Sequence, residues 1–507
     1  MTDATAAAAL TRVPHSFLGH PRGLATLFFT EMWERFSYYG MRALLILFMT
    51  AAVSQGGLGM SAETAGAVYG LYTAGAYLSA LPGGWVADRL IGQRRCAFWG
   101  GILISVGNLM LAVPSHIELF YIGLLIIALG TGLLKPNVSC MVGALYQNDT
   151  GSRRDAGFSI YYLGINLGAV IAPFVAGTIG ETAGYRWGFC SAGVAMIFGL
   201  FQYRATAHWL GDAGVEPNPA TEAQRRRGWW IFGAGIALIV GLVAAAATGA
   251  LHVNVLELAG TAGIVMIALA IVFFGSIFLF GHLQPIEKKR VAVIALFLIC
   301  SAVFWAGYEQ AGSTLNLFAR DYTDRSFLGS YFAGGQHPTS WYQSVQALYV
   351  LIFAPVFAWI WLALGRRNLD PSAPVKFGLG LLQLGLGFAV MMVAAKLVTS
   401  SGHPVLPVWL LLTYLLQTTG ELCLSPVGLS NVTKLAPARY VGQMMGTWFM
   451  GMAIGNLAAG LIGGEVGGGS ITDMPVQFFH MALVGGGTGV ILLLIARPVR
   501  AWLGGVR

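Results

Sequence analysis

The chain has 507 residues, of which 56% are hydrophobic and only 10% are charged, and its mean hydropathy is +0.70. Soluble proteins carry about 25% charged residues, so this composition excludes a soluble globular protein and indicates a membrane protein. The net charge of +8 raises the question of a nucleic-acid partner, but the basic residues lie at the ends of apolar runs, which argues against one.

Apolar runs of roughly 20 residues recur along the chain, which is the length that a helix needs to cross a hydrocarbon core of about 30 Å. Barrel strands would be shorter and alternating, so the runs predict an all-α integral membrane protein. Six spans are expected first, at residues 23–53, 64–87, 96–113, 119–145, 157–179 and 187–209. Two more follow a polar stretch, at 229–248 and 258–280. Six complete the chain, at 291–318, 341–364, 377–397, 408–434, 442–462 and 478–496.

These fourteen expected spans form a 6+2+6 plan. We expect an N-terminal arm over residues 1–22, a six-helix bundle over 23–209, a linker with two inserted transmembrane helices over 210–290, and a second six-helix bundle with a short tail over 291–507. Lys and Arg favour cytoplasmic loops, and most of the 29 basic residues fall on the side of both termini. The arm, linker and tail are therefore expected in the cytoplasm. The five cysteines are scattered singly, so we expect unpaired thiols.

The first span carries charged residues that would be costly in lipid. Each charge within a bilayer costs roughly 2.5 to 3.5 kcal/mol on insertion scales, so charges persist mainly where they face a cavity and find partners. Glu31, Glu34, Arg35, Tyr38 and Arg42 lie at i, i+3, i+4, i+7 and i+11, which places them on one side of a helix. This polar stripe predicts a functional interior surface. The alternative is a static set of ion pairs that holds helices together.

The charges of the two halves are polarised. Lys135 adds a third cation to the two arginines of the first half, directly before the kink-forming Pro136, whereas the second half has the unmatched acids Glu309 and Glu421. A ligand with a carboxylate at one end and an ammonium at the other could bridge such halves. Transporters built from two repeats place their site at this midplane.

Aromatic and amide side chains on the same spans could line the walls of such a site. They are Tyr38, Tyr39, Tyr77, Asn166 and Trp448. Taken singly, each of these residues is as readily explained by packing.

The stretch EMWERFSYYG (31–40) matches the E-x-x-E-R-F-x-Y-Y-G signature of the proton-dependent oligopeptide transporter family of the major facilitator superfamily. YYLGINLGA (161–169) resembles the family's F-Y-x-x-I-N-x-G-S signature, with Tyr161 replacing Phe and Ala169 replacing Ser. Further resemblance lies in GGWVADRLIGQRR (83–95), GLLKPNVS (132–139), FWAGYEQ (304–310) and ELCLSPVGLS (421–430). The resemblance covers both halves, and the 6+2+6 plan is similar to that of bacterial members.

The resemblance implies a role for each charged group. Glu31, Glu34 and Arg35 would form rearranging ion pairs with Lys135 that couple protonation to opening. Arg42 and Lys135 would receive a peptide carboxylate, Glu421 with Asn166 would receive the amino group, and Glu309 would act in gating or proton coupling.

Other positions shape the site or its gate in this resemblance. Tyr39, Tyr77 and Trp448 would form side-chain pockets. Gln346 stands where the family usually has Asn before Pro, so the amino-terminal pocket is expected to differ in reach. Asp88 and Arg89 resemble the general facilitator gating loop, although ordinary loop charge would also explain the arginine.

The resulting expectation is a proton-coupled symporter that imports di- and tripeptides through a bacterial inner membrane and acts as a monomer. It is not expected to be an enzyme or to hold a metal or a cofactor, protons being the coupling ion. Two alternatives remain open, a proton symporter for nitrate or a drug-like anion on the same fold and a transport-inactive peptide sensor. Glu421 argues against the first, because a pure anion would gain nothing from a carboxylate.

Overall fold

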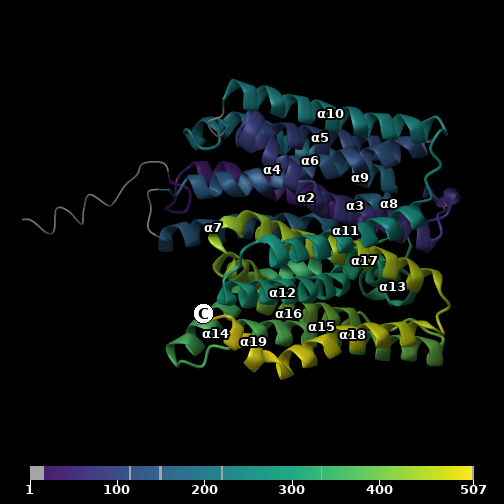
Figure 1. Cartoon of the computed structure of the whole chain (residues 1–507). Helices are drawn as coiled ribbons and strands as arrows, with labels where there is room; N and C mark the ends of the chain where they lie inside the picture. Colours follow the sequence, from purple (N-terminus) through teal and green to yellow (C-terminus); the bar gives the residue numbers. More distant parts are fainter. Residues whose placement is uncertain (1–15, 114–115, 148–150, 218–220, 333, 505–507) are drawn as a thin grey trace, which may run out of the picture.

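The computed structural model describes residues 16–113, 116–147, 151–217, 221–332 and 334–504. Long helices run side by side in two stacked bundles (Figure 1). The first bundle contains α2 (Gly23–Thr50), α3 (Ala62–Leu78), α4 (Ala80–Val86), α5 (Gln93–Ala112), α6 (Ile117–Ala144), α7 (Gly151–Ala172), α8 (Thr178–Thr182) and α9 (Tyr185–Thr206). The second contains α12 (Pro285–Tyr308), α13 (Thr314–Tyr322), α14 (Gln343–Arg366), α15 (Ala373–Ser401), α16 (Val408–Leu435), α17 (Val441–Gly468), α18 (Met474–Leu494) and α19 (Ala496–Trp502). The inserted pair is α10 (Glu222–Ala247) and α11 (Val255–Phe280).

The all-α fold predicted from the apolar runs is confirmed, and each expected span falls on a helix or on a broken pair of helices. Within the described residues, ten helical segments are long and apolar enough to cross a membrane. The other four expected spans fall on α2, α3, α9 and α16. The charges of α2 and the break that ends α3 after 17 residues explain why such helices escape a test based on length and hydropathy.

Three spans that the sequence presents as continuous are broken in the structure. The second stops at Leu78 and resumes as α4 at Ala80, with the Ser79 hydroxyl donating to the Ala128 carbonyl at 2.7 Å. The fifth contains a wider turn over Pro173–Gly177 (η3), where proline removes a backbone donor. The seventh span, numbering the spans of the two bundles without the inserted pair, passes through a tight turn over Glu309–Gly312 (η5) between α12 and α13. The length of an apolar run in the sequence does not predict such breaks in a helix.

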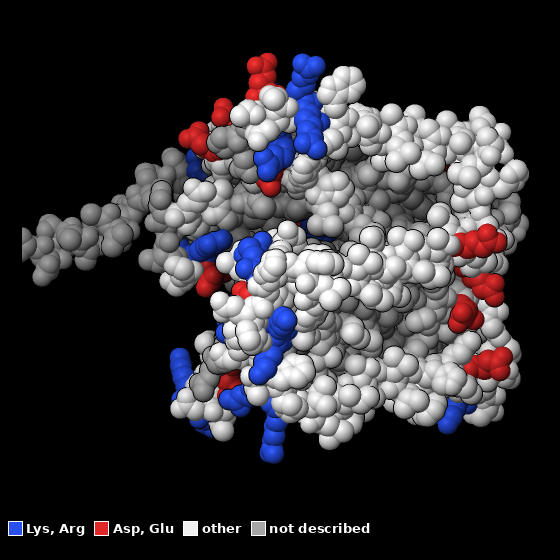
Figure 2. All heavy atoms as spheres, in the orientation of Figure 1, with Lys and Arg blue, Asp and Glu red and all other residues white. Residues whose placement is uncertain are grey.

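The helices alternate in direction, so the molecule has two ends. We call the end where α2 begins the basic end, because exposed cations gather there, and the opposite one the far end. The left end of Figure 2 shows most of the Lys and Arg, whereas the right end is mainly acidic. Exposed side chains at the basic end include Arg22, Arg89, Lys288 and Arg439.

The two halves cross closely where α3 meets α17. A Cβ atom on Gly66 would lie 2.3 Å from the carbonyl oxygen of Gly460, and one on Gly70 would lie 2.8 Å from that of Leu457. Both distances are shorter than any real contact, so these positions admit only glycine without a shift of backbone. Small residues at helix crossings allow this approach in membranes. The glycine-rich second span therefore forms part of the seam between the halves.

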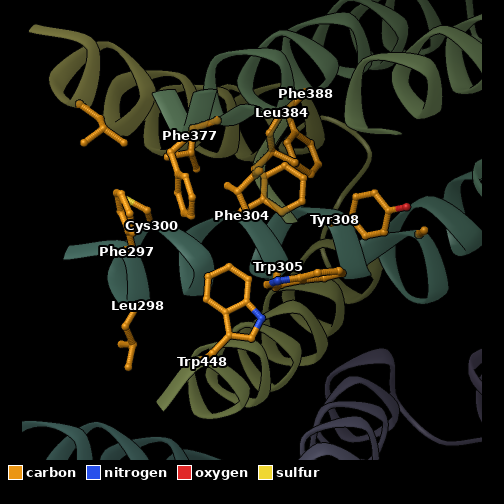
Figure 3. Close-up of a cluster of buried hydrophobic side chains, with 14 of the residues drawn as sticks. Phe297, Leu298, Cys300, Phe304, Trp305, Tyr308, Phe377, Leu384, Phe388 and Trp448 are labelled. Carbon is orange, nitrogen blue, oxygen red and sulfur yellow. The ribbon is translucent and has the colours of Figure 1, made fainter. Parts of the chain in front are cut away.

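The core of the second half is aromatic and leads directly to the interface. Phe297 and Phe377 stack with ring centroids 4.2 Å apart, and Phe304, Trp305 and Tyr308 continue the row along α12 (Figure 3). The row ends at Tyr308, whose hydroxyl donates a hydrogen bond to Glu421 outside the core. Packing of α12 thus fixes the position of a polar group near the seam.

Candidate functional site

The polar stripe of α2 lies inside the protein, as its spacing predicts. Glu31, Glu34 and Arg35 are 0%, 1% and 4% exposed. Arg35 donates from Nη2 to Glu34 Oε1 at 2.6 Å and from Nε to the other Glu34 oxygen, and its Nε lies 3.3 Å from Glu31 Oε1. Among the described residues no donor meets either Glu31 oxygen with hydrogen-bond geometry, although the Tyr161 hydroxyl lies beside this carboxylate. Two buried carboxylates therefore share one guanidinium, which leaves one excess negative charge.

Arg42 crosses the interface to the second half. Its Nη2 lies 2.7 Å from Glu309 Oε2, with both side chains 5% exposed, and its Nε donates to the Tyr69 hydroxyl at 2.7 Å. Glu309 is thus matched across the halves, as expected from the lack of a partner on its own helix. Arg42 is engaged by Glu309 in this form, so the expected contact with a carboxylate ligand would require that ion pair to open. Tyr69 was not anticipated, because it lies in a glycine-rich stretch without charge.

Lys135 is placed differently from expectation. Its ammonium lies 4.8 Å from the centroid of the Tyr77 ring, and among the described residues it forms no ion pair. In this form Arg35 contacts both α2 acids and Lys135 pairs with neither, so the expected rearrangement that would bring Lys135 to them stays a prediction. Lys135 and Tyr77 are only partly buried. A cation supported by an aromatic face therefore stays accessible in the first half.

Within the part of the chain that the structure describes, Glu421 has a neutral partner and no cation. The Tyr308 hydroxyl donates to Glu421 Oε2 at 2.6 Å, and the Glu421 side chain is partly accessible. The Asn166 amide donates to the Tyr162 carbonyl of its own helix, and its shared role with Glu421 stays a prediction. Tyr308 was not singled out from the sequence, although it lies within the FWAGYEQ stretch.

The remaining wall residues mostly bond or pack within the protein. Gln346 is 8% exposed and its amide donates to Gln417 Oε1 at 3.2 Å. Trp448 is 4% exposed and packs edge-on against Phe377. Tyr39 lies with its ring 5.7 Å from the Arg42 guanidinium and is partly accessible. Only Tyr39 among these three stays open to a ligand.

The expected gating loop lies at the basic end of the first half. Asp88 and Arg89 are exposed in the turn Ala87–Ile91 (η2) at the basic end. Neither forms an ion pair with another described residue. Their position fits a loop that meets solvent, and it leaves their role a prediction.

The site offers two accessible groups of opposite charge, one in each half, which we call its poles. Lys135 in the first half and Glu421 in the second are partly accessible, and among the described residues neither is paired with an opposite charge. The charges of Arg42, Glu309 and Glu421 all act on Tyr39, and the charge of Glu309 also acts on Lys135. No cluster of three or more metal-binding side chains occurs among the residues described.

Comparison with known proteins places this arrangement in a family. A family model described as the POT family matches residues 94–467. A peptide transporter of Yersinia enterocolitica is 42% identical over 495 residues, covering 96% of both chains, and a di-/tripeptide transporter of Lactococcus lactis is 38% identical, covering 98% of this chain and 99% of the relative. A crystal structure of a POT peptide transporter in complex with sulfate matches with a TM-score of 0.88 at 40% identity, covering 99% of each chain.

Proposed function

Because this chain belongs to the POT family of transporters, we propose that it imports di- and tripeptides together with protons by alternating access. The Yersinia and Lactococcus relatives, which are peptide transporters, match it over nearly their full length. The observation that carries the proposal within this chain is the pair of accessible poles, Lys135 on one half and Glu421 on the other.

These poles suit a short peptide better than a simple anion. A peptide carboxylate would pair with the Lys135 ammonium, and a peptide ammonium would pair with Glu421 beside the Tyr308 hydroxyl. Charge-assisted hydrogen bonds of this kind contribute about 1.5 to 3 kcal/mol each. Tyr39 and Tyr77, which are partly accessible, would then limit the length and shape of the cargo, and Asn166, Gln346 and Trp448 would contribute in a form that exposes them. Nitrate, the alternative cargo, would leave Glu421 without a partner.

Proton coupling would arise from the charge balance of α2. Glu31, Glu34 and Arg35 together carry one excess negative charge in a buried place, and a buried charge is unfavourable unless it is matched. Either a proton or the ammonium of Lys135 could supply the match. Binding of a peptide carboxylate to Lys135 would remove the second option and favour the first. Glu31 would be the better proton acceptor of the two acids, because Arg35 donates two hydrogen bonds to Glu34 but makes only a longer contact of 3.3 Å with Glu31.

The orientation follows from the cations. We assign the basic end to the cytoplasm, with both termini there, because Lys and Arg favour cytoplasmic loops. The far end then faces outward, and several contacts close it in this form. Asn316 donates to the Ala43 carbonyl at 2.9 Å and Arg320 to the Thr50 hydroxyl at 2.7 Å. Asp88 and Arg89 would act on the cytoplasmic side.

The proposal is tested by uptake into liposomes that hold the purified protein under an inward proton gradient. A labelled dipeptide should accumulate, tripeptides should compete, and free amino acids and nitrate should not. Lys135→Gln should reduce dipeptide uptake by about tenfold or more, with Lys396→Gln, an exposed lysine at the far end, as the matched control. Competition by nitrate without competition by peptides would favour the anion symporter. Peptide binding without uptake would favour a sensor.

A further inference from the structure

The far end contains a contact between a side chain of one half and the backbone of the other. Glu181, in α8, accepts hydrogen bonds from the backbone N–H of Thr339 at 2.8 Å and of Ser340 at 2.7 Å, one with each carboxylate oxygen. The acceptor belongs to the fifth span, and the donors begin the eighth span of the two bundles, which continues as α14. We call this contact the Glu181 clasp.

The two donors are groups that a helix leaves unsatisfied. Thr339–Tyr342 (η7) opens a helical segment that continues to Arg366, and the first N–H groups of a helix have no acceptor within it. Pro338 precedes the segment and provides no capping side chain. Glu181 therefore caps the eighth span from the opposite half. Its negative charge also faces the positive end of the helix dipole.

Neighbouring contacts show that the surfaces on either side of the clasp are fitted to each other. The Trp341 indole donates to the Thr178 hydroxyl at 2.8 Å, and the Ser344 hydroxyl donates to the Val170 carbonyl at 2.8 Å. A Cβ atom on Gly177 would lie only 2.1 Å from the Ser340 hydroxyl oxygen.

We propose that Glu181 is a positioning residue of the transport cycle, which latches the fifth span against the eighth when the far end is closed and releases it when the far end opens. The inference rests on the proposed alternating access. Because the two donors are backbone amides, movement of the eighth span away from α8 breaks both hydrogen bonds of the clasp. Glu181 is partly accessible, so water can replace either partner on opening. The clasp is therefore suited to reversible closure.

The test compares Glu181→Gln with the wild-type protein in conformational assays that need no substrate. Spin labels at Val53 and Phe327, which are 73% and 86% exposed on opposite halves of the far end, report opening as a longer distance. Removal of a helix cap corresponds to roughly a tenfold change in an equilibrium, so the long-distance population should rise about tenfold. Hydrogen exchange at the Thr339 and Ser340 amides should become faster. Glu118→Gln, at another exposed far-end acid, should change neither.

A rescue variant separates the latch from a purely structural cap. Pro338→Ser, added to Glu181→Gln, gives the eighth span a cap of its own, because the backbone at 338 is extended (φ −57°, ψ 137°) as an N-cap requires. The latch predicts that protection of the Ser340 amide returns while the Val53 to Phe327 distance stays long. Return of the short distance as well would overturn the latch, as would unchanged distance and exchange in Glu181→Gln.

The conformational test of Glu181 does not depend on which solute the protein transports. If Glu181→Gln shifts the distance as expected but the wild-type protein does not transport peptides, only the proposed cargo is contradicted. Peptide uptake by the wild type with no conformational response to Glu181→Gln would contradict the latch alone. Should Glu181→Gln fail to fold, Glu181→Asp, which shortens the side chain by one methylene, provides the same comparison.

Discussion

Replacement of Glu309 by Gln should shift the protein toward the form in which the far end is open. The Arg42–Glu309 ion pair joins the halves at 2.7 Å, with both side chains 5% exposed. Removal of one partner of a buried ion pair destabilises by about 3 to 5 kcal/mol, because the other charge stays buried without a match. This penalty applies only to the closed form, since opening separates the halves and lets water reach Arg42.

Other contacts of Arg42 reduce the free-energy penalty of leaving it without Glu309. Arg42 would keep its 2.7 Å hydrogen bond to the Tyr69 hydroxyl and its approach to the Tyr39 and Tyr69 rings, which together offset roughly 1 kcal/mol. The Gln amide oxygen would still accept a hydrogen bond, offsetting about 1 kcal/mol more. A net effect of about 2 kcal/mol corresponds to roughly a thirtyfold shift in the equilibrium.

The shift is measured by the distance between spin labels at Val53 and Phe327 in a protein whose native cysteines are replaced. Glu309→Gln should enrich the long distance, and addition of Arg42→Gln should reverse much of that change, because it removes the unmatched charge. Glu465→Gln, at an exposed acid of the far end, is the control. The reasoning is refuted if Glu309→Gln leaves the distances unchanged, or if the control shifts them equally.

Three further predictions concern coupling, recognition and packing. Glu31→Gln should abolish proton-driven accumulation, while peptide counterflow persists. In the wild type this accumulation reaches about a hundredfold for a proton moving down roughly 100 mV and half a pH unit. Glu118→Gln should retain both activities, and full driven uptake by Glu31→Gln would contradict the coupling role. Glu421→Gln should weaken dipeptide binding about tenfold but leave analogues without a free amine unaffected, and equal losses in competition assays would remove Glu421 from the amino-group site. Gly66→Ala should destabilise the protein by about 1 to 3 kcal/mol and lower the Tm, whereas Gly75→Ala, in open space on the same helix, should not; similar Tm values would argue against the tight crossing.

The sequence predicts elements well where one physical signal dominates. The charge stripe of α2 could only be buried, because charged side chains on a lipid face are too costly, and Glu31, Glu34 and Arg35 are indeed enclosed. The same holds for the long apolar runs, which all became helices.

Partners across the interface were harder to predict. Spacing within a helix shows which residues share a face, but it does not show which residue of a distant helix lies opposite. Within the first half, the resemblance grouped Lys135 with Glu31, Glu34 and Arg35, whereas in this form Arg35 alone contacts the two acids. Tyr308 and Tyr69 were missed because a buried hydroxyl carries no charge signal. Glu181 was missed because its partners are backbone amides, which every residue possesses.

The inserted helix α11 has a consequence for the membrane itself. Ala259 and Met266 of α11 pack with Ala67 of α3 and Leu457 of α17, so this helix touches both halves along the line where they cross. It thereby screens that line from acyl chains on its side. Because the contacting side chains are small or flexible and apolar, hydrocarbon on that side meets apolar side chains of α11 where it would otherwise meet the glycine-rich backbone of the crossing.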